Sequence, residues 1–246
     1  MTIALLADIH ANREALTACL ADAARRNVDR FVFLGDYVGY GADPGWVVDR
    51  VIEHTARGAL AILGNHDAAV CGAPETMNPT AQEAIEWTRH RLDATQCGFL
   101  ERLPTTLTID ERLFVHASAH APQHWHYIMD ARDAGRSLQA TTAQQTFCGH
   151  LHVPAIYYPS STGKLIEFAP VAGTQIPLLR GRKWLAVIGS VGQPRDRNPT
   201  ACYALLDDEQ NTLTYIRVPY DVATAARKVR EAGLPAILAV RLERGN

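Results

Sequence analysis

The feature that most constrains the fold is a pattern that recurs five times along the chain. In each case a short apolar run ends in a cluster of polar side chains, and short bounded apolar runs suit buried strands. In open α/β sheets, ligands bind at the carboxyl ends of the strands. We therefore expect the five clusters to surround one small volume. They are Asp8/His10, Asp36, Asn65/His66/Asp67, His116 and His150/His152.

Predicted helices alternate with the first of these strands. Asn12 can cap a helix over residues 13–26, between strands at 2–7 and 30–34. A second helix at 46–54 precedes a strand at 60–63. This alternation predicts α/β architecture with parallel pairing. Two helices are expected within 80–103 and one within 118–145, and the final helices are expected at 221–231 and 236–244.

The second half of the chain is richer in strands and turns. No repeat, low-complexity tract or linker divides it, so we expect one domain over residues 1–246 that is built on two sheets. The further strands are predicted at 107–109, 113–115, 146–148, 155–158, 165–168, 184–188, 202–207 and 212–218.

Composition narrows the class of protein. The formal net charge of −2 and the lack of basic runs argue against a nucleic-acid partner. Five scattered cysteines without a CxxC pair argue against a disulfide framework or a cysteine zinc site. No apolar run approaches the length of a membrane span, and the first residues lack the basic start of a signal peptide. We expect a cytoplasmic protein with no membrane partner.

The polar clusters have the chemistry of a metal centre. Buried carboxylates and imidazoles gathered in one place are costly without a cation. This mixture without thiolate suits Mn, Fe, Zn or Ni better than calcium, and we expect manganese first. The candidates are too many for one tetrahedral zinc and suit two ions that share a bridge. The seven candidate ligands are Asp8, His10, Asp36, Asn65, His116, His150 and His152.

The stretch Gly64-Asn65-His66-Asp67 combines several functions in four residues. Glycine, asparagine and aspartate all favour turns, so a simple turn would explain most of it. In the context of the other clusters, Asn65 offers a metal-ligand oxygen and His66 a general acid. Asp67 offers a carboxylate that orients that acid.

The order of these motifs resembles the calcineurin-like metallophosphoesterase superfamily. The motifs are Asp8-Ile9-His10, Gly35-Asp36, Gly64 to Asp67, His116 and Gly149 to His152. The segment from Gly189 to Asp196 is further similar to small bacterial and archaeal phosphodiesterases of that superfamily. The resemblance implies an α/β fold of two packed mixed β-sheets flanked by helices, a four-layer sandwich.

The resemblance also implies a role for each motif residue. One ion would be held by Asp8, His10 and His152. A second would be held by Asn65, His116 and His150, with Asp36 bridging both. His66 would then be the acid near the leaving group, with Asp67 orienting it.

The expected activity is dinuclear metal-dependent hydrolysis of small-molecule phosphodiesters, such as diadenosine polyphosphates or cyclic nucleotides. A nuclease, a phosphomonoesterase and a non-catalytic protein-binding scaffold are the alternatives. The Val-Asp-Arg-Gly segment of phosphoprotein phosphatases is replaced by Tyr37-Val38-Gly39-Tyr40-Gly41, which argues against a phosphoprotein substrate. The sequence leaves the oligomeric state open.

Several residues have two interpretations. Tyr37 and Tyr40 can either stack on a substrate ring or pack their loop. Arg195 can pair with a phosphate, although a structural role is slightly favoured. A solvated loop is favoured over substrate contacts for three further histidines, His120, His124 and His126.

Overall fold

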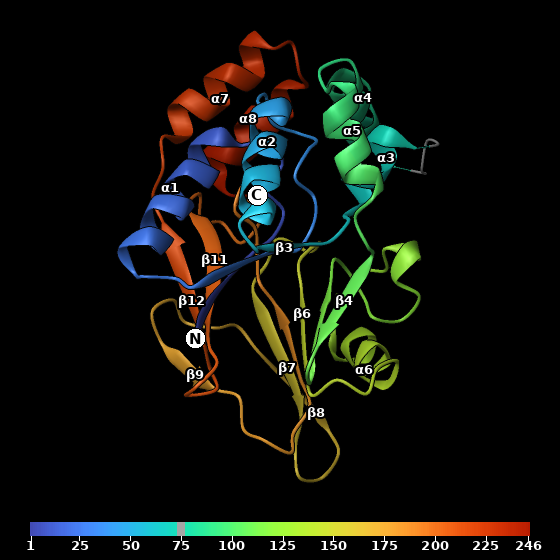
Figure 1. Cartoon of the computed structure of the whole chain (residues 1–246), viewed down its shortest axis with the longest axis vertical. Helices are drawn as coiled ribbons and strands as arrows, with labels where there is room; N and C mark the ends of the chain where they lie inside the picture. Colours follow the sequence, from blue (N-terminus) through green and yellow to red (C-terminus); the bar gives the residue numbers. More distant parts are fainter. Residues whose placement is uncertain (73–76) are drawn as a thin grey trace.

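The computed structural model describes residues 1–72 and 77–246. Two mixed six-stranded sheets lie face to face, and helices cover their outer faces. Figure 1 shows most helices gathered beyond one sheet, with α6 on the other side of the molecule. This is the predicted α/β architecture of two packed mixed sheets flanked by helices.

The first sheet combines parallel and antiparallel strands in the order β3-β2-β1-β11-β12-β9. Strands β1, β2 and β3 pair in parallel, and the remaining neighbours pair antiparallel. The strands are β1 (Thr2–Leu6), β2 (Arg30–Phe33), β3 (Leu60–Ala61), β9 (Gln175–Pro177), β11 (Ala201–Asp207) and β12 (Thr212–Val218).

The second sheet has the order β4-β5-β6-β10-β7-β8. Strands β5, β6 and β10 are parallel, and antiparallel strands flank them on both sides. The strands are β4 (Thr106–Ile109), β5 (Arg112–Val115), β6 (Gln145–Cys148), β7 (Ala155–Pro159), β8 (Leu165–Phe168) and β10 (Trp184–Val187). The predicted polar clusters follow β1, β2, β3, β5 and β6, and all five strands belong to the parallel parts of the sheets.

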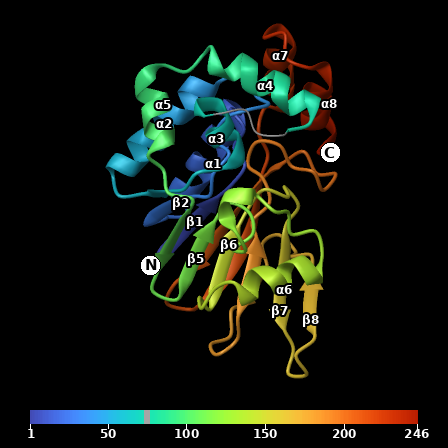
Figure 2. The ribbon, with the colours of Figure 1, turned by 90° about the vertical axis from the view of Figure 1, so that its right-hand side faces the viewer.

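Several helices begin where a capping side chain accepts from one of the first backbone amides. The Asn12 side chain accepts from Ala15 N at 3.0 Å, and the Asp221 side chain accepts from Thr224 N at 2.9 Å. In Figure 2, α6 lies beside β7 and β8, apart from the other helices. The helices are α1 (Arg13–Arg25), α2 (Pro44–Ala56), α3 (Asn65–Cys71), α4 (Pro79–Arg89), α5 (Ala94–Glu101), α6 (Ala131–Gln139), α7 (Val222–Glu231) and α8 (Ala236–Arg244), with a 3-10 turn at Pro122–His124.

Three apolar clusters connect the sheets to each other and to the helices, and a fourth packs α4, α7 and α8 together. Leu5, Phe147 and Tyr215 belong to the core between the two sheets. Leu16 of α1 and Phe33 of β2 belong to the core between the helices and the outer face of the first sheet. A third cluster packs α6 on the second sheet. The four layers fix the ends of the parallel strands near one another, where the polar clusters lie.

Two elements differ from the sequence-based expectation. The predicted strand at 60–63 pairs only over Leu60–Ala61, and the next stretch begins helix α3 at Asn65 instead of forming a plain turn. Strand β9 (Gln175–Pro177) was not predicted, because three edge residues that end in proline carry little periodic signal. None of the helices in the described part of the chain has the length and apolar character of a membrane span.

Candidate active site

The five polar clusters meet where the parallel strands of both sheets end. Asp8 follows β1, Asp36 follows β2 and His116 follows β5. Backbone hydrogen bonds hold these ends side by side: Asp8 N donates to Gly35 O at 3.1 Å, and Gly149 N donates to His116 O at 2.9 Å. All seven predicted ligands are buried. The structure therefore brings together side chains that are up to 144 positions apart in the sequence, from position 8 to position 152.

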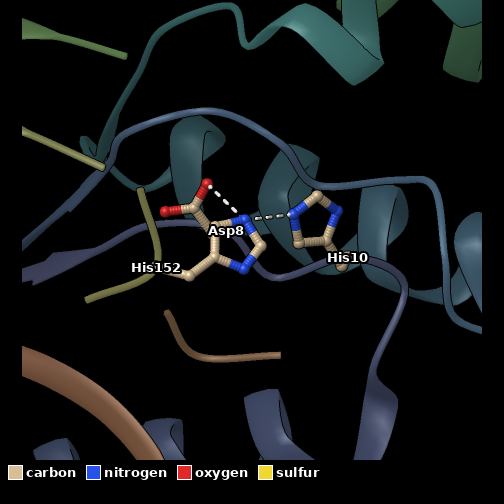
Figure 3. A group of neighbouring side chains, drawn as sticks. All are labelled: Asp8, His10 and His152. Carbon is tan, nitrogen blue, oxygen red and sulfur yellow. Dashed lines mark hydrogen bonds and ion pairs between the residues drawn. The ribbon is translucent and has the colours of Figure 1, made fainter. Parts of the chain in front are cut away.

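Asp8, His10 and His152 form one compact group at the first of these strand ends (Figure 3). Their ligand atoms all lie within 4.8 Å of one another. His152 Nε2 is 3.4 Å from Asp8 Oδ1 and 3.0 Å from His10 Nε2. Two imidazoles and one carboxylate form a donor set suited to a transition-metal ion.

The outer nitrogens of these two histidines are fixed by backbone carbonyls. His10 Nδ1 lies 3.1 Å from Val38 O, and His152 Nδ1 lies 2.6 Å from Gln193 O. A carbonyl can only accept, so both Nδ1 atoms carry the proton and both neutral rings turn a lone pair inward. Burial also lowers the pKa of both rings well below the usual histidine value. Two facing lone pairs fit a cation between the rings, so these residues fit a metal ion.

A second group contains Asp36, His116 and His150, and its ligand atoms also lie within 4.8 Å of one another. His116 Nε2 is 3.3 Å from Asp36 Oδ2 and 3.2 Å from Asn65 Oδ1. Its Nδ1 lies 2.7 Å from Leu34 O, so this ring is oriented in the same manner as His10 and His152. Asp36 Oδ2 is also 3.7 Å from His10 Nε2. Asp36 thus stands between the two groups.

His150 connects the second group to the first. Its backbone N–H donates to both Asp8 carboxylate oxygens, at 2.9 and 3.1 Å. Its ring hydrogen-bonds to the backbone of Trp125, while Nε2 is buried and has no hydrogen-bond partner among the described residues. A buried nitrogen with a free lone pair carries a desolvation cost that a bound cation would remove.

Among the hydrogen bonds of the described residues, none joins Asp67 to the His66 ring, and the role in which Asp67 orients His66 stays a prediction. The Asp67 carboxylate accepts from Asp36 N at 2.8 Å, Tyr37 N at 2.9 Å and Gly64 N at 3.0 Å. A Cβ on Gly64 would overlap the backbone nitrogen and the carboxylate of Asp36, so only glycine fits there. Asp67 therefore positions the loop that presents Asp36.

Five of the predicted ligands have left-handed backbone conformations. Each has φ between 48° and 67°, a region that residues other than glycine rarely adopt. Such residues cluster at functional sites, where the surrounding structure imposes the strain. They are Asp8, His10, Asp36, His150 and His152.

Burial and mutual charge shift the acid–base behaviour of the site. Burial raises the pKa of Asp8 to about 8 and lowers the pKa of His150 to about 3. For His116, burial opposes protonation, but the Asp36 carboxylate prevails and raises the pKa to about 9. Burial opposes ionisation of Asp36, but the His116 charge prevails and holds the pKa of that carboxyl well below its usual value. The raised pKa values of Asp8 and His116 favour protons on these two groups, and a bound metal ion would displace those protons.

A cavity of about 670 Å³ opens beside these groups, and His66, Asn65 and His150 form part of its lining. The His66 backbone N–H donates to Asp36 Oδ1 at 2.8 Å, which holds this residue next to the second group. Its ring centroid lies 4.8 Å from that of His10, and Nδ1 is buried without a partner in the described part of the chain. The ring is placed between the metal-ligand groups and the cavity.

The structure distinguishes the two tyrosines of the glycine-rich loop. Tyr37 is fully buried, and its hydroxyl donates to Ile62 O at 2.6 Å, so it packs the loop. Tyr40 lies against His10 and His66, with ring centroids 4.6 and 4.5 Å apart, and lines the cavity.

Arg195 lies beside the site. Its Cζ is 5.8 Å from the Tyr40 ring centroid, and its backbone N–H donates to His152 O at 3.3 Å. Its Nη2 donates to Gln193 Oε1 at 3.1 Å, whereas Nε is buried and unpartnered within the residues described. The sequence slightly favours a structural role for Arg195, but a purely structural role gives no partner to this buried N–H donor.

The segment that follows His116 forms the outer wall of the cavity. His120, His124 and His126 are exposed, as expected for a solvated loop, and His124 also lines the cavity. Sequence reasoning did not identify Tyr127, whose ring stacks on His150 with centroids 3.9 Å apart. The sequence could have pointed to Tyr127 because it directly follows the segment His124-Trp125-His126.

Comparison with known proteins gives consistent matches over nearly the whole chain. Residues 1–211 match the model of the calcineurin-like phosphoesterase superfamily domain. An uncharacterised protein of Methanocaldococcus jannaschii is 33% identical over 253 residues, which cover 98% of this chain and 96% of that protein.

Solved structures show the same fold. A metallophosphoesterase from Sphaerobacter thermophilus is 36% identical and aligns with a TM-score of 0.90 over 100% of this chain and 99% of the other. A hypothetical protein from Pyrococcus horikoshii is 18% identical and aligns with a TM-score of 0.80 over 100% and 98% of the two chains. The second likeness concerns the fold alone.

Proposed function

Since the chain belongs to the calcineurin-like phosphoesterase superfamily and is a metal-dependent phosphoesterase, we propose that it hydrolyses small phosphodiesters of the nucleotide type. The observation that carries the metal-centre part of this proposal is the pair His10 and His152. Their inward Nε2 atoms are 3.0 Å apart, while both Nδ1 atoms are committed to backbone carbonyls. Such an arrangement is stable when a cation accepts both lone pairs.

Two divalent ions would be held by the two groups of side chains. Asp8, His10 and His152 would hold one, and the second group would hold the other. Asp36 would serve both, because its Oδ2 is 3.3 Å from His116 Nε2 and 3.7 Å from His10 Nε2. The members of the second group are Asn65, His116 and His150. Manganese is the first expectation for this donor set, with Fe, Zn and Ni as alternatives.

Bound divalent ions neutralise phosphoryl oxygens and lower the pKa of a coordinated water. The chain's own residues supply the remaining functions. His66 lies between the ligand groups and the cavity, where its ring can donate a hydrogen bond or a proton to the leaving oxygen. An anionic phosphoester beside it would favour the protonated imidazole and oppose the effect of burial, which lowers its pKa.

Arg195 supplies the cation that the loop after Asp36 lacks. Its unpaired, buried Nε suits a phosphoryl oxygen, because a guanidinium binds phosphate through two parallel N–H donors. This role differs from the structural one favoured by the sequence, and it compensates for the absence of an arginine at Tyr37-Val38-Gly39.

A metal-reconstituted substrate screen tests the proposed function. Metal-free protein would be loaded separately with Mn, Fe, Zn or Ni and assayed on nucleotide diesters, phosphomonoesters, dinucleoside polyphosphates and single-stranded DNA. We expect the highest kcat/KM on small diesters, and the Asp36→Asn variant purified in parallel controls for contaminating enzymes. Preference for monoesters or DNA, or no turnover by metal-loaded protein, would contradict the proposal.

A further inference from the structure

The cavity beside His66 lies where a leaving group would lie. Its volume of about 670 Å³ is within the range of small-molecule sites in proteins. Its floor includes Asn65, His66 and His150, and residues from α4 and from the segment after His116 form its walls. Whatever is bonded to a phosphorus atom at the metal centre and faces His66 must occupy this space.

The described residues that line the cavity include no lysine, arginine or carboxylate side chain. Its polar side chains are imidazoles, amides and tyrosine hydroxyls. Arg195 is not part of this lining. A second or third phosphate would be desolvated here without a cation to pair with, which is costly. The cavity therefore suits an uncharged group.

Aromatic rings form much of the wall. Tyr127 stacks on His150 at 3.9 Å between centroids with an interplanar angle of 23°, and the Trp125 ring stands edge-on to His116 at 5.9 Å. Tyr40 adds a third ring beside His66. The Tyr127 side chain is nevertheless 47% exposed. It is the most exposed Phe, Trp or Tyr among residues 1–72 and 77–246. One face of Tyr127 is held by His150, and much of the side chain remains open to a ligand.

We infer that this cavity binds a planar, uncharged leaving group of the aryl or nucleoside kind, joined to a single phosphate, with Tyr127 as its stacking partner. The inference rests on the proposed function and narrows its substrate class. Stacking on tyrosine tolerates any flat ring. The exposed side chains of Gln123 and His124 provide hydrogen-bonding groups for the polar edge of such a ring.

The test compares two synthetic diesters with the Mn-loaded protein. Methyl phenyl phosphate has an aryl leaving group, and its partner has a fluorinated aliphatic leaving group of matched acidity. We expect Tyr127→Ala to lower kcat/KM on the phenyl ester by about ten- to hundredfold, as for the loss of one stacking partner, and to leave the aliphatic ester within about twofold. Tyr127→Phe keeps the ring and should keep both rates.

The outcomes separate this inference from the proposed function. An equal loss on both esters, or a loss of bound Mn, would mean that Tyr127 acts through His150 and would overturn the inference. Unchanged rates in Tyr127→Ala would overturn it as well. Failure of the wild-type protein to hydrolyse either ester would instead overturn the proposed function.

A second arm tests the absence of charge in the cavity. We expect a dinucleoside polyphosphate to be turned over at least about tenfold less efficiently than a dinucleoside monophosphate, because the further phosphates meet no cation. Preference for the polyphosphate would overturn the inference while leaving the phosphoesterase activity established.

Discussion

His10 and His152 face each other across 3.0 Å, Nε2 to Nε2, while each ring is held from behind by a backbone carbonyl. Both Nδ1 atoms donate, so the inward nitrogens of the neutral rings present lone pairs to one another. A third donor, Asp8 Oδ1, lies 3.4 Å from His152 Nε2.

Replacing one of the two facing histidines should empty one metal site. In His152→Asn, asparagine tolerates the left-handed backbone at this position (φ 65°), so the change removes the imidazole without adding strain. We expect the Mn content after reconstitution to fall from two ions per chain to one, with turnover lost. His90→Asn is the matched control, because His90 is exposed and lies outside the site. Undiminished metal content in His152→Asn would contradict the assignment.

The role of Asp67 is separable from that of His66. Asp67→Asn places an NH2 group among the backbone donors Asp36 N, Tyr37 N and Gly64 N. We expect a loss of about 1–3 kcal/mol in the free energy of unfolding and a weakening of metal affinity by about 10–100-fold. The fall in rate should be equal for good and poor leaving groups. A fall confined to poor leaving groups would instead support the role in which Asp67 orients His66.

His66→Gln should show the opposite pattern. The ring is not among the proposed ligands, so we expect metal content to be retained while kcat on poor leaving groups falls by about 10²–10⁴, the usual contribution of a general acid. Esters with acidic leaving groups should be affected least. The measurement is the dependence of log kcat on leaving-group pKa, which should become steeper in the variant. A parallel shift of the whole line would argue against proton donation by His66.

Arg195→Ala should raise KM for the phosphodiester and lower kcat/KM by about 10–100-fold, corresponding to the loss of a hydrogen bond to a charged group. Arg195→Lys should recover only part of this, since lysine lacks the forked donor. Arg197→Ala is the control, because Arg197 is exposed two positions along the chain. If Arg195→Ala lowers the melting temperature but leaves the kinetics unchanged, the arginine is structural.

The metal-free protein should lose stability as the pH rises from 6.5 to 8.5. The folded-state pKa values of Asp8 (about 8), Asp67 (about 7) and His116 (about 9) all lie above their usual values of 3.8, 3.8 and 6.5. Each proton therefore binds the folded state more tightly, and the stability it provides is lost as the pH passes the folded pKa. Each group contributes at most about 1.4 kcal/mol per pH unit.

Thermal unfolding of chelator-treated protein measures this dependence, and Asp8→Asn should reduce it. Metal ions compete with the same protons, so the stabilisation produced by Mn should increase with pH over the same range. A metal-free melting temperature that rises with pH from 6.5 to 8.5 would contradict the prediction, and would mean that the buried histidines with lowered pKa values outweigh these three groups.

Much of the site was predictable because strand ends have a sequence signature. Asp8, Asp36 and His116 each follow an apolar run. Parallel pairing of β1 and β2 places Asp8 beside Asp36, whereas His116 follows β5 of the second sheet and reaches them through the packing of the two sheets. The alternation of strands and helices likewise predicted the α/β architecture, and the strand-rich second half predicted a second sheet. These inferences depend only on side-chain type and spacing, which the sequence contains.

The contacts that the sequence did not predict are those between side chains and distant backbone groups or rings. The carbonyl partners of His10 and His152 belong to Val38 and Gln193, and nothing in a side-chain pattern identifies a carbonyl. The sequence paired Asp67 with its neighbour His66, and it gave no sign of the four backbone amides that donate to the Asp67 carboxylate. Tyr127 was overlooked because its importance comes from stacking across the fold on His150.

The left-handed backbone of Asp8, His10, Asp36, His150 and His152 has a consequence for how this protein can change. Each such residue costs roughly 1–2 kcal/mol that glycine would not incur. Selection for stability alone would therefore favour replacing these residues with glycine, and selection for activity retains them. Thermostable variants of this enzyme should accordingly accumulate their substitutions at helix caps and surface loops, and leave these strand ends unchanged.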